Sequence, residues 1–396
     1  MGFRLIKDFM FLLLIFSFIN DNFIVNIAGE SALKAIFGLF ILVNIKEILH
    51  AFIRPKNRIL KTFFIYIFIM IIIMLITKVF YSHTTLASGF LVLMPMTIIF
   101  AYLSYYENFE RLLYIIWISV VVSSIISFFN PPVDQWTFRR SGGTMDPNEF
   151  SAQLLMASAI TIFLYEKNRN LIFLVGSLVL FLIVFVYAGS KSAMLTLAIL
   201  GFYALIIKFG SLFRKILSFK GLIALAIVGL IVLQVDFNKF EAVSGMQDRA
   251  AQHGTADTRF VSWEAGWRMA QDNFLLGIGL EVYEDYARGY AVDYIADGSL
   301  APHNVFVKLI AEAGIFAFVS FLVFLYYLFT TKSMQIRQSS YFWIALATYS
   351  NVLMGLTLSS TYDKTFWIAL ALLSNVIIIL YKEQNKVKNE NTTHFL

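Results

Sequence analysis

The sequence predicts an all-α integral membrane protein that crosses the bilayer with about twelve helices. Of its 396 residues, 59% are hydrophobic and only 14% are charged, whereas a soluble domain has about a quarter charged residues and under half apolar ones. Apolar runs of about 18 residues or more recur along the chain, which is long enough for a helix to cross the bilayer core. Cysteine is absent, which excludes disulfides and thiolate metal sites.

The expected spans follow from these apolar runs in chain order. The first is expected to be retained, because no small-residue cleavage site follows it at the distance typical of a signal peptide. Asn20 and Asp21 interrupt this span, and Lys46 and Glu47 interrupt the second. The spans lie near residues 8–28, 33–53, 60–79, 84–104, 111–129, 148–165, 170–187, 190–208, 217–235, 303–329, 340–358 and 364–381.

The positions of lysine and arginine predict the orientation, because short cytoplasmic loops are enriched in both. They cluster at the N-terminus, in the loops after the second, sixth, eighth and tenth spans, and after the last span. This pattern places both termini in the cytoplasm and makes residues 1–381 one membrane domain, followed by a polar, disordered tail at 382–396. The largest loops, 130–147 and 236–302, then face outward, the second between spans nine and ten.

The first outward loop places two arginines beside the expected start of a helix. Asp146 is a good N-cap, and Glu149, three residues later, completes a capping box, so capping is the expected role of both. Capping does not explain Arg139 and Arg140, which precede two glycines. Guanidinium groups and a helix N-terminus both suit a bound anion. Anchoring to lipid headgroups is an equally good interpretation of the two arginines.

The second outward loop contains an amphipathic helix. Its apolar stripe predicts a buried face, and two tryptophans in the stripe suit a membrane interface. Arg259 lies on the shoulder of this stripe, while Arg268 points toward water, so Arg259 is the better candidate for a functional role. The glycines that follow are expected to end the helix. The stripe consists of Phe260, Trp263, Trp267, Ala270 and Phe274.

Polar residues also begin the apolar run at 303–329. Pro302 suits a helix start, which would place His303 and Asn304 in the first turn at the outer membrane boundary. Asn304, Lys308 and Glu312 follow at intervals of four and form one polar stripe, in which the lysine and glutamate are expected to neutralise each other. His303 lies on another face, where an imidazole can accept a proton near neutral pH.

Four stretches together resemble the O-antigen ligase and O-antigen polymerase superfamily of bacterial envelope glycosyltransferases. The resemblance covers the middle and later half of the chain, and the order and outward placement of the stretches match the family. They read "RRSGGTMDPNEF", "AGSKSAML", "TRFVSWEAGW" with "GIGLEVY", and "PHNVFVKLIAEAGIF".

The resemblance implies a GT-C-like, metal-independent glycosyltransferase without a cofactor, in the bacterial inner membrane and with its active site facing outward. The donor would be a glycan on undecaprenyl diphosphate and the acceptor a glycan or the lipid A core, with membrane lipids as further partners and no nucleic acid. No Asp-x-Asp pair is present to hold a divalent ion. Ligase and polymerase remain open alternatives, as do the sugars and the oligomeric state.

The resemblance also implies roles for individual residues. Arg259 and either Arg139 or Arg140 would hold the diphosphate, whose departure needs charge stabilisation. His303 would contact the reacting groups and orient or deprotonate the acceptor hydroxyl. Asn304, Asn148 and Lys191 are supporting candidates, although a lysine at a membrane boundary commonly extends its charge to water without further function.

Two other classes of protein fit parts of the pattern. The first is a twelve-span secondary transporter or a protein that translocates lipid-linked glycans, but the two halves of the chain show no similarity to each other. The second is a structural assembly protein, which would not need arginines and a histidine converging on one face. A cavity open to lipid that brings these residues together favours the enzyme, whereas a closed pore at the midplane favours the transporter.

Overall fold

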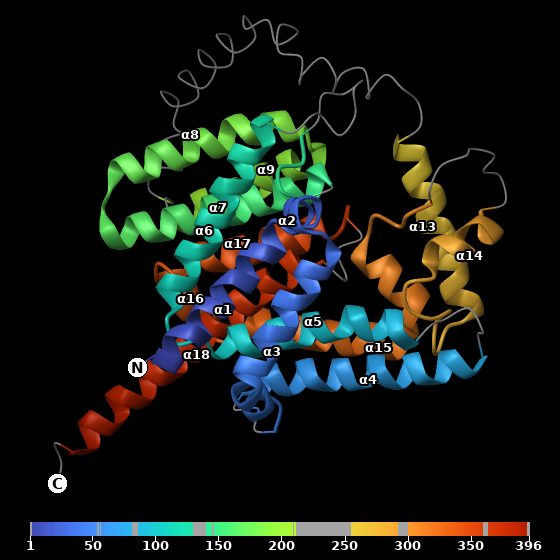
Figure 1. The fold of residues 1–396 in the computed structure, drawn as a ribbon, viewed down its shortest axis with the longest axis horizontal. Helices are drawn as coiled ribbons and strands as arrows, with labels where there is room; N and C mark the ends of the chain where they lie inside the picture. Colours follow the sequence, from blue (N-terminus) through green and yellow to red (C-terminus); the bar gives the residue numbers. More distant parts are fainter. Residues whose placement is uncertain are drawn as a thin grey trace, which may run out of the picture.

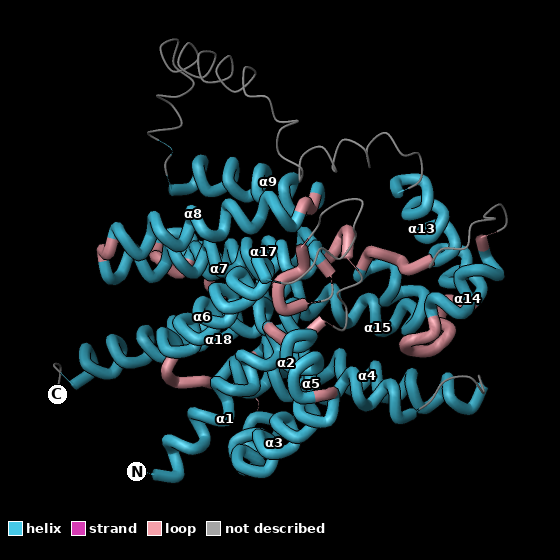
Figure 2. The backbone as a smooth tube through the Cα atoms, turned by 45° about the horizontal axis from the view of Figure 1, so that its top comes forward, coloured by secondary structure: helices cyan, strands magenta, loops and turns pink. Residues whose placement is uncertain are grey.

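The computed structural model describes residues 2–53, 55, 57–80, 86–129, 140–144, 146–208, 210, 255–291, 300–358 and 363–393. Every regular element within these ranges is a helix (Figures 1 and 2). The helices are α1 (Gly2–Ile19), α2 (Asp21–Ala28), α3 (Glu30–Ile53), α4 (Arg58–Phe80), α5 (Leu86–Tyr105), α6 (Phe109–Phe129), α7 (Pro147–Asn168), α8 (Leu171–Ala188), α9 (Lys191–Lys208), α13 (Thr255–Asp272), α14 (Tyr283–Tyr290), α15 (Val305–Thr330), α16 (Ser333–Gln338), α17 (Phe342–Met354) and α18 (Lys364–Thr393).

The all-helical membrane class is confirmed for the described residues. Seven of their helices are long and apolar enough to cross a membrane, or eight if the bent pair α1–α2 forms one span. Helices also occupy the remaining predicted spans, except that 217–235 lies outside the described residues. The total of twelve spans therefore stays a prediction.

The first predicted span, 8–28, bends sharply where the sequence predicts an interruption at Asn20 and Asp21. α1 and α2 meet at a 97° bend at Asn20. The side chain of Asn20 is buried, and its Nδ2 donates to the carbonyl oxygens of Phe16 and Ser119, each at 3.2 Å. A polar side chain that bonds backbone carbonyl groups replaces interactions lost where the helix ends. The sequence position of Asn20 thus explains where the bend occurs.

α18 lies at the centre of the bundle and packs against α5, α17 and α15. Trp367, near its start, is fully buried in a cluster of aromatic rings contributed by four helices. Such rings bury large apolar areas and favour tilted or edge-to-face contacts, so the cluster fixes how these helices pack. The other rings are Phe63 and Tyr66 of α4, Phe100 of α5, and Phe321 and Phe324 of α15.

The predicted disorder of the C-terminal tail is wrong for most of its length. α18 continues to Thr393, and its last turns project from the bundle (Figures 1 and 2). The added residues are mainly lysine, glutamate, glutamine and asparagine. Lysine, glutamate and glutamine favour helix, and a helix that is already nucleated extends at little cost.

The orientation leads to a labelling prediction. Gly289 and Gln338 are both exposed, and a β-carbon added at Gly289 would meet nothing within 4 Å. Because the chain has no cysteine of its own, single variants Gly289→Cys and Gln338→Cys each carry one thiol. With the outer barrier permeabilised, an impermeant maleimide should label Gly289→Cys in intact cells and Gln338→Cys only after the inner membrane is lysed. The reverse order would contradict the positive-inside assignment.

Candidate functional site

A cavity of about 360 Å³ forms where the starts of α7, α14 and α15 approach the segment before α18. Its polar lining is mostly acidic, with His303 and Lys308 as the basic groups. Seven carboxyl groups line it: Asp146, Glu149, Glu281, Glu284, Asp285, Glu312 and Asp363. Buried or half-buried carboxylates need donors, and the hydroxyl groups of a sugar can supply them.

His303 occupies a strained position at the wall of this cavity. Its φ of 42° lies in the left-handed region, which is uncommon for residues other than glycine. It precedes α15, because Asn304 is the N-cap and its Oδ1 accepts from the backbone N–H groups of Phe306 at 2.9 Å and Val307 at 3.1 Å. The expected helix start at Pro302 is therefore wrong by three residues. Strain of this kind is retained where the surroundings hold a side chain in place.

α13 holds the segment that carries His303. The Ser262 hydroxyl shares its one proton between the carbonyl oxygens of Leu300 and Ala301, at 2.9 and 3.0 Å, and Trp263 Nε1 donates to that of Pro302 at 2.7 Å. These contacts fix the backbone immediately before the histidine. The helix that carries Arg259 and the segment that carries His303 are thus joined directly.

Arg259 lies one turn before these anchors and interacts electrostatically with His303. Burial lowers the pKa of His303, and the positive charge of Arg259 lowers it further, while Asp146 and Glu284 oppose the decrease. Burial also lowers the pKa of Arg259, opposed by Asp146. The imidazole is therefore neutral near pH 7 and can accept a proton, while the arginine remains charged because its ordinary pKa is far above neutrality.

The predicted burial of the aromatic stripe of α13 is wrong for three of its members. Phe260, Trp267 and Phe274 are 63%, 55% and 52% exposed. The face that packs on the protein instead carries Ser262, Ala265 and Met269, which are buried. Small residues allow close packing against α15, and the aromatic face remains available to a membrane interface.

Arg268, on the same helix, has a different environment from Arg259. Its guanidinium bonds Glu264 at 2.5 Å in an i,i+4 pair and the Tyr290 carbonyl oxygen at 3.2 Å. Neither arginine lines the cavity, but Arg259 interacts electrostatically with the lining residues His303 and Asp146, whereas Arg268 is engaged by Glu264 and Tyr290. Arg268 is therefore a matched control for substitutions at Arg259.

Lys308 and Glu312 belong to a network that is larger than the predicted pair. Lys308 Nζ lies 3.0 Å from Glu281 Oε1, and the fully buried Glu312 accepts from the Tyr283 N–H at 3.1 Å. Lys308 and Glu312 also attract each other electrostatically. Lys308 therefore interacts with carboxylates of two segments: Glu312 on its own helix and Glu281 in the loop before α14. Residues 277–282 of this loop are called the glycine turn below.

The glycine turn interlocks with a break in α15 at Gly314. Gly277 and Gly314 have φ of 69° and 68°, and ψ at Gly314 is −173°. A β-carbon at Gly277 would lie 2.3 Å from the Glu312 carbonyl oxygen, and one at Gly314 would lie 2.4 Å from that of Leu275. Each backbone therefore passes through the space that a side chain would occupy.

Backbone hydrogen bonds close this interlock. The N–H groups of Ile278 and Gly279 donate to the carbonyl oxygens of Ala311 and Glu312 at 3.0 and 2.9 Å, and Ile315 N–H donates to that of Phe274 at 2.9 Å. Carbonyl groups left unpaired by the break thus gain new donors. The interlock holds Glu281 and Glu312 at the cavity wall.

The predicted N-cap of α7 is confirmed, whereas Glu149 has a different role. Asp146 Oδ1 accepts from the Asn148 N–H at 2.7 Å, with Pro147 at the first helical position. Glu149 does not complete a capping box, because its side chain hydrogen-bonds Asp363 in the cavity. Burial raises the pKa of Asp363 to about 6. Two carboxyl groups joined in this way share one proton.

Sequence reasoning missed Asp363 and its neighbourhood. Lys364 Nζ lies 2.8 Å from Asp21 Oδ2, so the bend of the first predicted span meets the start of α18 beside the cavity. The signal was present, since Asp363 and Lys364 are charged residues at the outward end of a predicted span and Asp21 is a charged residue that interrupts another. Charges at membrane depth are costly and commonly functional.

The structure does not bring every candidate residue to the cavity: His303 lines it, whereas Arg259 lies beside His303 without lining it. Arg140 donates from Nη1 to the Ser127 carbonyl oxygen at 2.5 Å and faces the Tyr187 ring at 5.9 Å. The Asn148 amide donates to Asp146 Oδ1 at 3.0 Å, and Lys191 is exposed at the start of α9. None of these three lines the cavity. Arg139 lies outside the described residues.

These features define a helical membrane protein with a polar cavity at one end of its bundle and a histidine and arginine beside it. Residues 176–322 match the family model described as O-antigen ligase. The match confirms the predicted resemblance to an O-antigen ligase or polymerase-type family, and it supports a role in joining glycans at a membrane. It includes Arg259 and His303 but not the loop with Arg140. A search of the curated proteins finds no match to the chain.

Proposed function

We propose that the protein transfers a glycan from undecaprenyl diphosphate to a saccharide acceptor at the outer face of the inner membrane. The observation that carries this proposal is the coupling of Arg259 and His303 beside an acidic cavity, within the segment that matches the O-antigen ligase family. The two residues supply the two functions that such a reaction needs. One stabilises a departing diphosphate, and the other accepts a proton from a hydroxyl group.

The reaction has a simple balance of bonds. The acceptor hydroxyl oxygen forms a bond to the anomeric carbon of the donor sugar, while the bond from this carbon to the diphosphate oxygen breaks. The electron pair and the negative charge leave with the lipid diphosphate, where the Arg259 guanidinium stabilises them. The hydroxyl proton passes to the neutral imidazole of His303. No step requires a metal ion.

The acidic lining favours a division of the site into two parts. Carboxylates such as Glu284 and Asp285 accept hydrogen bonds from sugar hydroxyl groups, but they repel a diphosphate. The acceptor saccharide therefore occupies the cavity, and the diphosphate lies on the side of Arg259, which is outside the cavity lining. The exposed aromatic face of α13 keeps this side next to the membrane, where the lipid of the donor resides.

Substituting Arg259 tests the proposal. Arg259→Lys keeps the charge but loses the planar pair of donors that matches a diphosphate. We expect transfer to fall by about ten- to a hundredfold, equivalent to the loss of a charge-assisted contact worth about 1.5–3 kcal/mol. The measurement is surface glycan formed per amount of membrane protein.

Arg268→Lys is the matched control, since it lies on the same helix and is bound to Glu264. Its transfer rate should stay close to that of the wild type. Equal rates for the two variants would remove Arg259 from the donor site.

A further inference from the structure

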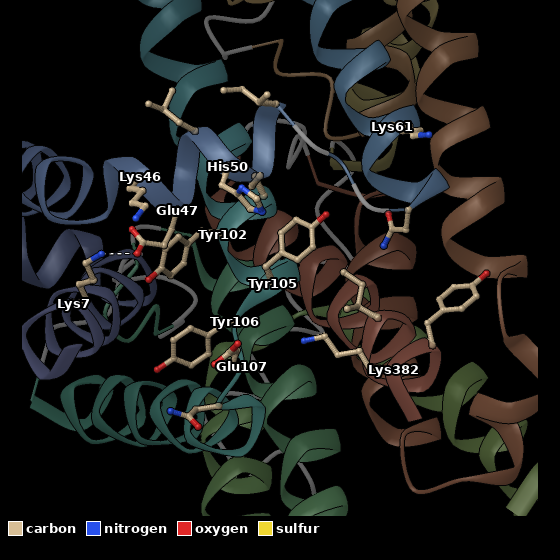
Figure 3. Close-up of a pocket in the computed structure, with 18 of the residues that line it drawn as sticks. Lys7, Lys46, Glu47, His50, Lys61, Tyr102, Tyr105, Tyr106, Glu107 and Lys382 are labelled. Carbon is tan, nitrogen blue, oxygen red and sulfur yellow. Dashed lines mark hydrogen bonds and ion pairs between the residues drawn. The ribbon is translucent and has the colours of Figure 1, made fainter. Parts of the chain in front are cut away.

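A second cavity, of about 1240 Å³, lies at the other end of the bundle, between α1, α3, α4, α5 and α18 (Figure 3). Lys382 lines it, 18 residues along α18 from Lys364, which places it about 27 Å from the acidic cavity along the helix axis. The two cavities therefore face opposite sides of the membrane. In the predicted orientation, the larger one opens to the cytoplasmic leaflet.

The charge of this cavity is opposite to that of the first. Five lysine and arginine side chains line it against three carboxylates. Glu47 pairs with Lys7 at 2.5 Å, and Asp8 pairs with Arg111 at 3.4 Å, so two of the three carboxylates are already engaged. Among the described residues, Lys46, Arg58, Lys61 and Lys382 have no ion-pair partner. The cavity thus has a surplus of cations.

An uncharged hydrogen-bond donor, the side-chain amide of Asn57, also favours an anionic ligand in this cavity. Asn57 lines the cavity, and its Oδ1 accepts from the Leu60 N–H at 2.8 Å, which fixes the carboxamide. Its Nδ2 is buried and has no acceptor within the part of the chain that the structure describes. A buried donor without an acceptor is costly. Together with the unpaired cations, it favours a ligand that carries anionic oxygen atoms.

The remaining lining favours a ligand with an apolar part. Leu49 and Ile53 line the cavity and are also 51% and 72% exposed, so the cavity opens on the apolar flank of α3. Tyr102 and Tyr105, which Figure 3 shows beside His50, add rings with a polar end. Such rings are typical of the boundary between headgroups and acyl chains.

We propose that this cavity binds the phosphate headgroup of an anionic phospholipid, with the first part of its acyl chains against Leu49 and Ile53. Basic pockets between helices on the cytoplasmic side are suited to such headgroups, because the anionic leaflet supplies the ligand at high local concentration. The proposal does not depend on glycan transfer. It can therefore fail while the proposed function holds, and the converse is also true.

The test measures lipid binding to the purified full-length protein in detergent. Three probes are compared: a short-chain phosphatidylglycerol, the phosphatidylcholine of the same chain length, and inorganic phosphate. The wild type should bind phosphatidylglycerol at least about tenfold more tightly than either other probe. Lys61→Gln combined with Lys382→Gln should weaken phosphatidylglycerol binding by roughly tenfold or more, because two contributions from charge are lost.

The matched control is Arg169→Gln combined with Arg337→Gln, which removes two exposed cations outside the cavity lining. It should bind phosphatidylglycerol as the wild type does. If both double variants bind phosphatidylglycerol equally weakly, the lipid is attracted by the basic surface as a whole. This result would contradict a specific site in the cavity. Competition by inorganic phosphate at the same concentration would identify the free anion as the ligand and would contradict the proposal that the ligand is a phospholipid. Thermal unfolding of each variant verifies that it is folded.

Discussion

Replacing His303 with alanine is expected to reduce glycan transfer by about a hundred- to ten-thousandfold, the usual contribution of a general base. Protein level and donor binding should stay close to those of the wild type, because Asn304 still caps α15 and the residue proposed to hold the donor, Arg259, is unchanged. The measurement is transfer normalised to membrane protein, with donor binding followed in parallel.

The same histidine predicts a pH dependence. Only neutral imidazole accepts a proton, and burial together with Arg259 lowers the pKa of His303 below its ordinary value of 6.5. Transfer by the wild type should therefore be constant around pH 7 and should fall as the pH decreases through this lowered pKa. A loss of transfer that begins above pH 6.5, or near wild-type transfer by His303→Ala, would contradict the role of His303 as the base.

Replacing Gly314 with alanine should have the second large effect, on stability. The added carbon would lie 2.4 Å from the carbonyl oxygen of Leu275, just before the glycine turn, and the φ and ψ of Gly314 are in a region that only glycine occupies readily. We expect the free energy of unfolding to fall by about 3 kcal/mol or more. Less protein should accumulate in the membrane, and thermal unfolding of the purified protein should start at a lower temperature.

Gly277→Ala should behave in the same way, because Gly277 is the other half of the interlock. Gly176→Ala and Gly201→Ala are the matched controls. Both glycines lie within helices and have nothing within 4 Å of an added carbon, so alanine there should be neutral or slightly stabilising. Equal stability of all four variants would show that the interlock does not hold the cavity wall.

Hydropathy alone predicted the helices well, because each crossing helix needs a long apolar run whatever its neighbours are. It marked an interruption at Asn20 but did not predict the bend there, and it missed the break at Gly314. The bend at Asn20 depends on a bond to Ser119, about a hundred positions away in the sequence. The break at Gly314 depends on the glycine turn. Neither contact leaves a periodic signal within the segment that it alters.

The candidate site was predictable in part, for a related reason. His303 and Arg259 stood out because they are polar and lie beside apolar runs on the predicted outer side. The membrane-interface role predicted for the tryptophans of α13 stays a prediction, but the burial of its aromatic stripe against the protein was predicted wrongly, because an apolar stripe faces the protein interior in water but can face lipid in a membrane. Asp363 was missed because its partner, Glu149, already had a satisfactory role in the sequence as a capping residue.

Transfer by the purified protein in proteoliposomes is the most direct measurement of the proposed reaction. The vesicles contain undecaprenyl-diphosphate-linked glycan, and a saccharide acceptor and a metal chelator are added. The account predicts one molecule of undecaprenyl diphosphate released for each glycan joined to the acceptor, with Arg259→Lys and His303→Ala both strongly reduced. Movement of intact donor across the membrane with no release of undecaprenyl diphosphate would contradict it and indicate a translocation protein.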